Sequence, residues 1–222
     1  MDNPVVLGLC GGFHAPRHTE GVRDLWARDP ALSAIPAFTL GTDVPWAPLS
    51  AHALRQSLDQ ALNQALNQAL NHDQPDTAGV GTDQARPEDR VDLILWAFSA
   101  GGVGAAALAH HWHRYRGTVR AIFLLDGWGV PWAGSAPLHR ISHDAFTHHS
   151  SRLLGAGRAD FFADPAVPHR QLWQSPQTVI GLGELPPNAA PPAPSQPLST
   201  ADFLTQWTRF YALPSLAAGQ ES

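Results

Sequence analysis

A single serine stands where an apolar run gives way to small residues. Residues 93–98 read LILWAF, and Ser99 is followed by Ala100, Gly101 and Gly102. A serine on a sharp turn between a buried strand and a helix presents its hydroxyl above the carboxyl end of a sheet. The backbone N–H after it and the positive end of the helix can stabilise an oxyanion. These residue types indicate a nucleophilic serine that forms an acyl intermediate.

The segment 97–101 resembles the nucleophile elbow Gly-x-Ser-x-Gly of the α/β-hydrolase family, with Ala97 in place of the first glycine. The order of the predicted elements over residues 4–126 resembles the central half of that fold. The resemblance implies a serine hydrolase that cleaves an ester or a thioester, without a cofactor or a metal. It also implies two oxyanion N–H groups, one from Ala100 and one from Gly12 or Phe13 in the loop after the first strand.

A catalytic triad in the order of that family needs a carboxylate after Ser99 and a histidine later in the chain. Asp126 ends the apolar run at 119–125, so its carboxylate would stand at the same sheet edge as Ser99. The alternative is that Asp126 caps the turn at 126–129. Three further aspartates are spare candidates for the acid: Asp144, Asp160 and Asp164.

Twelve histidines compete for the role of the base. The resemblance favours His169, which follows a short strand predicted at 160–163 and opens the helix expected after it. His143 is the second candidate, because it lies in the segment beyond Asp126. Three histidines at the end of a predicted helix are expected only to interact favourably with the helix dipole: His110, His111 and His113.

Two other groups of residues support different functions. His143, Asp144 and His148 allow a metal site, although they lack the i, i+4 spacing of ligands on one helix. Residues 102–107 read GVGAAA and Asp126 ends the next strand, which is the pattern of a dinucleotide-binding protein. Against this, three residues separate the strand from the first glycine, and few strands follow. A third alternative is a binding or scaffold protein that keeps the hydrolase fold without its activity.

The elements that must position these residues alternate along the chain. Continuous apolar strands separated by helices are typical of a parallel sheet covered on both faces. We therefore predict a three-layer α/β/α fold, similar to an α/β-hydrolase, with five or six mostly parallel strands. The expected strands are 5–10, 37–40, 93–98, 119–125 and 160–163. The expected helices are 17–27, 50–71, 103–115, one that reaches 181, and one that begins at Ser199 with Asp202 as its capping partner.

Length and composition limit the possible functions. The 222 residues predict a single domain with a polar loop at 72–90, a partial lid at 129–158 and a proline-rich connector at 186–197. A net charge of -5 disfavours a nucleic-acid partner, and one cysteine excludes an internal disulfide. The chain has no lysine, which excludes a Schiff base and a Walker-A loop.

Neither a signal peptide nor a membrane helix is indicated, so we expect a cytoplasmic protein. Three aromatic residues, Trp128, Trp132 and Phe146, are expected near the mouth of the site. They favour an apolar acyl group in the small-molecule ester or thioester.

Overall fold

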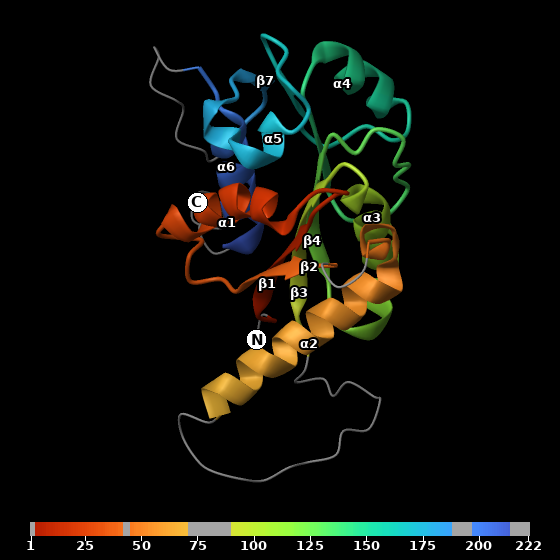
Figure 1. Cartoon of the computed structure of the whole chain (residues 1–222), viewed down its shortest axis with the longest axis vertical. Helices are drawn as coiled ribbons and strands as arrows, with labels where there is room; N and C mark the ends of the chain where they lie inside the picture. Colours follow the sequence, from red (N-terminus) through yellow and green to blue (C-terminus); the bar gives the residue numbers. More distant parts are fainter. Residues whose placement is uncertain (1–2, 42–44, 71–89, 188–196, 214–222) are drawn as a thin grey trace, which may run out of the picture.

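The computed structural model describes residues 3–41, 45–70, 90–187 and 197–213. Its centre is a seven-stranded sheet in the order β2-β1-β3-β4-β5-β6-β7, flanked by helices (Figure 1). Six strands are parallel, and β7 pairs antiparallel with β6 at one edge. The predicted α/β class with a mostly parallel sheet is confirmed. The strands are β1 (Val5–Cys10), β2 (Ala37–Leu40), β3 (Asp92–Phe98), β4 (Val119–Leu125), β5 (Leu138–Ser142), β6 (Phe161–Ala163) and β7 (Gly181–Gly183).

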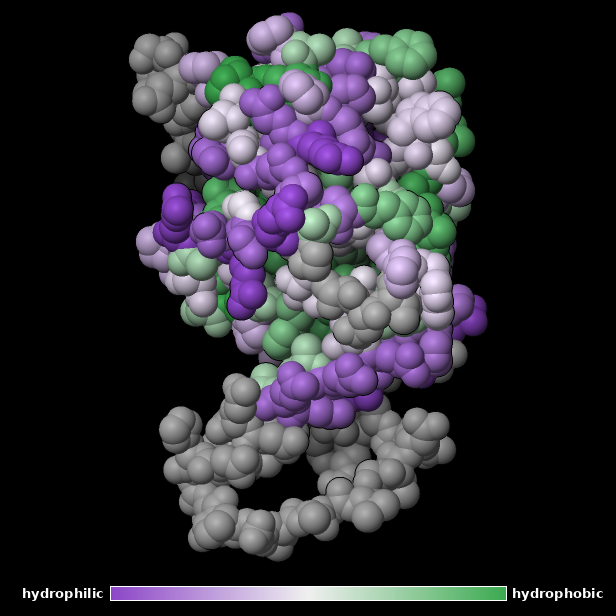
Figure 2. All heavy atoms as spheres, in the orientation of Figure 1, coloured by the Kyte–Doolittle hydropathy of each residue, from purple (hydrophilic) through white to green (hydrophobic). Residues whose placement is uncertain are grey.

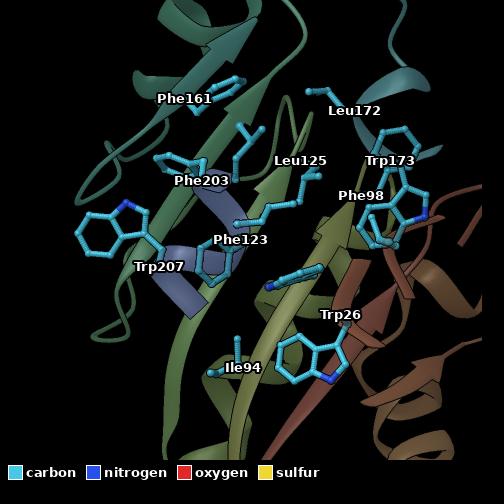
Figure 3. Close-up of a cluster of buried hydrophobic side chains, with 14 of the residues drawn as sticks. Trp26, Ile94, Phe98, Phe123, Leu125, Phe161, Leu172, Trp173, Phe203 and Trp207 are labelled. Carbon is cyan, nitrogen blue, oxygen red and sulfur yellow. The ribbon is translucent and has the colours of Figure 1, made fainter. Parts of the chain in front are cut away.

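Helices cover both faces of the sheet because its central strands are apolar on both sides. One buried cluster joins the sheet to α1 (Glu20–Arg28), α5 (Gln171–Gln174) and α6 (Thr200–Ala212). Figure 3 shows part of it, with Phe98 beside Trp173. The second cluster joins the opposite face to α2 (Ala51–Leu70) and α3 (Gly101–Tyr115).

Local sequence signals set the start of two long helices. The Ala53 N–H donates to the Ser50 hydroxyl at 3.2 Å, at the beginning of α2. Ser199 and Asp202 form a capping box at the start of α6, as predicted. Leu54 and Leu58 of α2 are buried, while the outer side of this helix is hydrophilic (Figure 2). The leucine stripe therefore faces the core up to the partly buried Leu62.

The segment 129–158 does not form a lid throughout, because Leu138–Ser142 is the buried strand β5. The strand escaped prediction because His139 and Arg140 interrupt its apolar pattern. Both side chains are buried with polar partners, which the sequence pattern does not reveal. The His139 Nδ1 lies 2.7 Å from the Ala159 carbonyl oxygen, and the Arg140 guanidinium donates to the carbonyl oxygens of Val130, Leu154 and Gly155.

The helix expected up to residue 181 is also wrong. The region instead contains the short α5, a 3-10 helix at Pro176–Thr178 and β7. Prolines at 165, 168 and 176 interrupt a helix there, because each lacks an N–H donor. With β5 and β7 added, the sheet has seven strands rather than five or six.

Three other expectations concern the polar loop, the proline-rich connector and the absence of a membrane helix. The polar loop at 72–90 and the connector at 186–197 lie almost entirely outside the described residues. Within the described ranges, no helix has the length and apolar character needed to span a membrane.

Candidate active site

Ser99 occupies a strained turn between β3 and α3. Its φ is 53°, in the left-handed region that residues with a Cβ rarely adopt. The Ser99 N–H donates to the Leu125 carbonyl at 2.8 Å, and the Ser99 carbonyl accepts from the Gly102 N–H at 3.0 Å. This strand–turn–helix geometry resembles that of a nucleophile elbow, and we call residues 97–101 the elbow.

The loop after β1 lies directly against this turn. A Cβ on Gly101 would overlap the carbonyl oxygens of Cys10 and Gly11. A Cβ on Gly12 would lie 3.1 Å from the Ser99 Cβ. Only glycine at position 101 allows the two backbones to come so close, and at Gly12 a Cβ would require a small shift of its neighbours. The loop is therefore adjacent to the serine, as the resemblance implied.

The side chain of His14 forms two hydrogen bonds with the backbone of this loop. The Gly12 N–H donates to the His14 Nε2 at 3.2 Å, and the His14 Nδ1 donates to the Ala15 carbonyl at 3.0 Å. In the part of the chain that the structure describes, the N–H groups of Phe13 and Ala100 make no hydrogen bond. Phe13 follows Gly12 and Ala100 follows Ser99, so each offers a donor without a partner among the described residues, whereas the Gly12 donor is occupied.

Asp126 directly follows β4, the strand that pairs with β3, and its side chain is buried. Its φ is 50°, so it shares the left-handed conformation of Ser99. The carboxylate accepts from the His169 Nδ1 at 2.6 Å and, through its other oxygen, from the His143 N–H at 2.9 Å. Among the described residues these are its hydrogen-bond partners, and none lies in the turn at 126–129. The side chain is thus directed to histidines rather than to a turn cap.

His169 lies in the segment between β6 and α5. Its ring stacks on Phe98, the residue before Ser99, with 4.6 Å between ring centroids. Trp173 of α5 stacks on the same phenyl ring at 5.6 Å. The carboxylate accepts a hydrogen bond from the protonated Nδ1, which leaves Nε2 as the ring atom able to accept a proton. The structure thus brings His169, Asp126 and the elbow together at one edge of the sheet.

His143 forms a second contact with the same carboxylate. Its Nδ1 lies 2.9 Å from the Asp126 Oδ2 but makes no hydrogen bond, and its Nε2 lies 3.1 Å from the Asp144 Oδ2. Burial alone would raise the pKa of Asp144, but hydrogen bonds from Thr147 and the charge of His143 hold this pKa below its ordinary value. The sequence offered no signal for this arrangement beyond the proximity of His143 to Asp144.

Three side chains at this edge, Asp126, His143 and His169, offer metal-ligand atoms within 4.8 Å of one another. The set differs from the metal site allowed by the sequence, which included His148. His148 is buried and its ring stacks on Phe162 at 4.9 Å. Asp144 does not belong to this ligand set. Its carboxylate caps the helix α4 (Ala145–Arg152) and lies beside the His143 ring.

The remaining candidates lie elsewhere or have structural partners. Asp160 accepts from the Arg140 N–H at 2.9 Å and pairs with Arg152 at 3.4 Å, while Asp164 is exposed. Complete burial raises the pKa of the Cys10 thiol to about 12, which keeps it protonated and unreactive. His110 and His111 are exposed near the end of α3, and the side chain of His113 lies outside what the structure describes.

Exposed apolar side chains follow several strands at this edge. Phe13 is 61% exposed after β1, and Trp128 is 65% exposed after β4. The Trp128 Nε1 donates to the Ser150 hydroxyl of α4 at 3.1 Å, and the neighbouring Phe146 is exposed. Trp132 was expected here but packs on His110 of α3, with 4.9 Å between ring centroids, and lies partly buried against the second core cluster.

The glycines of the dinucleotide pattern have a packing explanation. A Cβ on Gly102 would lie 3.3 Å from side-chain atoms of Leu124 and Val130. A Cβ on Gly104 would overlap the Pro48 carbonyl oxygen. These positions need a small residue because α3 packs closely on its neighbours. Compared with known proteins, the chain matches no family model and no curated sequence.

Proposed function

We propose that the protein is a serine hydrolase that cleaves a small ester or thioester through an acyl-Ser99 intermediate. One observation carries the proposal. The buried Asp126 carboxylate holds the His169 Nδ1 at 2.6 Å, and this ring stacks on the residue preceding a serine with a φ of 53°. A carboxylate, an oriented imidazole and a left-handed serine at adjacent strand ends are the parts of a catalytic triad.

In the proposed mechanism the Ser99 hydroxyl attacks the carbonyl carbon of the ester. Its proton passes to the His169 Nε2 and then to the leaving alcohol or thiol. Asp126 orients the imidazole and stabilises the charge that forms on it. Water, activated by the same Nε2, then releases the acid and regenerates the serine.

The tetrahedral oxyanion needs two donors in this scheme. The free N–H groups of Ala100 and Phe13 fit the role, because the Gly12 N–H is already bonded to His14. His14 would act through the loop by holding Gly12 beside the elbow. The exposed Phe13 and Trp128 favour an apolar acyl group over a charged one.

The test compares the unmodified chain with Ser99→Ala and, as a matched control, with Ser33→Ala, which removes an exposed hydroxyl far along the chain from the site. A fluorophosphonate probe is expected to label the first and the third, and not Ser99→Ala. Hydrolysis of a p-nitrophenyl ester should fall by about 10³-fold or more in Ser99→Ala.

The melting temperatures of the three proteins show whether each is folded. Equal labelling of Ser99→Ala and the unmodified chain would refute the nucleophile assignment. A folded, unmodified chain that neither reacts with the probe nor hydrolyses esters would favour a non-catalytic binding or scaffold protein instead.

A further inference from the structure

We propose that Asp126, His143 and His169 bind one Zn²⁺ ion and that this ion switches the enzyme off. The inhibitory part of this inference rests on the proposed hydrolase function. The site uses the residue pair of the triad together with His143, a histidine that the proposed reaction does not require.

The donor set matches the chemistry of zinc. Two imidazole nitrogens and one carboxylate oxygen are common ligands of this ion, and the three atoms already lie within 4.8 Å of one another. Zinc bonds of about 2.0–2.2 Å place tetrahedral ligands roughly 3.4 Å apart. Both histidines are partly exposed, so rotations of their side chains can widen the 2.6 and 2.9 Å contacts with the Asp126 Oδ2 and bring all three atoms to that spacing.

The position of His143 is the observation that points to a cation. Its Nδ1 is buried and has no hydrogen bond, although it lies 2.9 Å from the Asp126 Oδ2. When the ring proton is on Nε2, facing Asp144, two lone pairs face each other across this distance. A cation between them would convert that repulsion into two bonds.

Asp144 supports the site from outside. It lies 3.1 Å from the His143 Nε2, in the place of the carboxylate that commonly orients a zinc-bound histidine. The His143 N–H holds the Asp126 Oδ1 at 2.9 Å, which fixes the carboxylate. Two carboxylates thus lie around two imidazoles. When both rings are neutral, the negative charge of the two carboxylates attracts a divalent cation.

Zinc at this position would block the proposed proton transfer. The His169 Nδ1 would give its lone pair to the metal, so the single proton of the neutral ring would move to Nε2. A protonated Nε2 cannot accept the proton of the Ser99 hydroxyl. The serine would stay in place but lose its base.

The binding test uses the full chain, freed of metal with a chelator that is then removed. Zn²⁺ is titrated by calorimetry into the unmodified chain, His143→Ala, Asp144→Asn and His52→Ala. His52 is an exposed histidine on α2 and serves as the control. We expect one ion per chain, at least tenfold weaker binding in His143→Ala, weaker binding in Asp144→Asn, and no change in His52→Ala.

Circular dichroism establishes that each variant is folded, and Asp144→Asn carries the test if His143→Ala is not. Zinc affinities unchanged in both His143→Ala and Asp144→Asn would overturn the metal site.

The inhibition test measures probe labelling and ester hydrolysis at each zinc concentration. In the unmodified chain both should fall as the ion binds and recover when EDTA is added. In His143→Ala the half-inhibitory zinc concentration should rise at least tenfold. An active chain that retains full activity when saturated with zinc would overturn the switch alone. Zinc binding through His143 in a chain with no hydrolase activity would instead overturn the proposed function and, with it, the switch.

Discussion

At the residue scale, the candidate site is built on two strained backbone positions. Ser99 and Asp126 have φ values of 53° and 50°, and such left-handed conformations cost about 1–3 kcal/mol each. Each N–H still bonds to the neighbouring strand, Ser99 to Leu125 and Asp126 to Ile141 at 2.7–2.8 Å. The hydrogen bonds of the sheet therefore extend to the two residues that would carry the chemistry.

The two histidines on Asp126 are expected to differ in their contribution to activity. His169→Ala should lower the rate of fluorophosphonate labelling by about 10³-fold or more, because the proposed base is lost. His143→Ala should lower it by about tenfold at most, because the backbone N–H that holds Asp126 remains. Labelling rates of both variants, measured beside Ser99→Ala, decide the assignment. The opposite order would transfer the role of base to His143.

At the scale of elements, the elbow depends on contact between α3 and the loop after β1. The first turn of α3 lies against the carbonyl groups that end β1, and Gly101 is the point of contact. The atoms nearest to Gly101 are backbone atoms of Cys10 and Gly11, so no flexible side chain could move away from an added Cβ. The placement of the proposed oxyanion donors therefore depends on Gly101, a position that contributes no functional group.

Gly101→Ala should destabilise the protein by about 3 kcal/mol or more, since its Cβ would meet the backbone of Cys10 and Gly11. The matched control is Gly102→Ala in the same turn. Its nearest neighbours are the side chains of Leu124 and Val130 at 3.3 Å, so we expect a change within about 1 kcal/mol. Urea unfolding of the two variants gives the comparison. Equal stabilities would mean that the loop adapts to the added methyl group.

Sequence patterns predicted the strands that are mainly apolar. They missed a strand whose polar side chains are buried only because hydrogen-bond partners satisfy them. The strands β1, β2 and β4 match their predicted bounds, because each is mainly apolar and has at most one polar residue, Thr39 in β2 and Arg120 in β4. The strand β5 was missed because the partners of His139 and Arg140 come from distant segments. At the site, Ser99 was identified from its local context. The approach of His143 to Asp126 could not be, because it depends on how β4 and β5 pair.

At the scale of the whole molecule, the interior contains a histidine, His139, that resists protonation. His139 is fully buried between Phe123 and the helix α6. Its Nε2 lies 3.0 Å from the Tyr211 hydroxyl. Burial lowers the pKa of His139 from 6.5 to about 4. In the unfolded chain this histidine binds a proton near its ordinary pKa, so the unfolded state takes up protons first as the pH falls.

Stability should therefore decrease as the pH falls from 6.5 to about 4, the window set by the pKa of His139. The shift corresponds to a loss of about 3 kcal/mol over that window. Urea unfolding at several pH values measures it. His139→Phe should flatten this dependence, and His52→Ala, at an exposed site, should not. The same slope in all three proteins would show that other groups control the acid sensitivity.

The order of the site residues along the chain has a consequence for biosynthesis. Ser99 and Asp126 follow β3 and β4, whereas His169 follows β6, more than forty residues later. During translation the nucleophile and the acid leave the ribosome well before the base. If the triad operates as proposed, a nascent chain cannot attack esters until β5 and β6 have joined the sheet. Hydrolysis would then begin only once the later part of the sheet has folded.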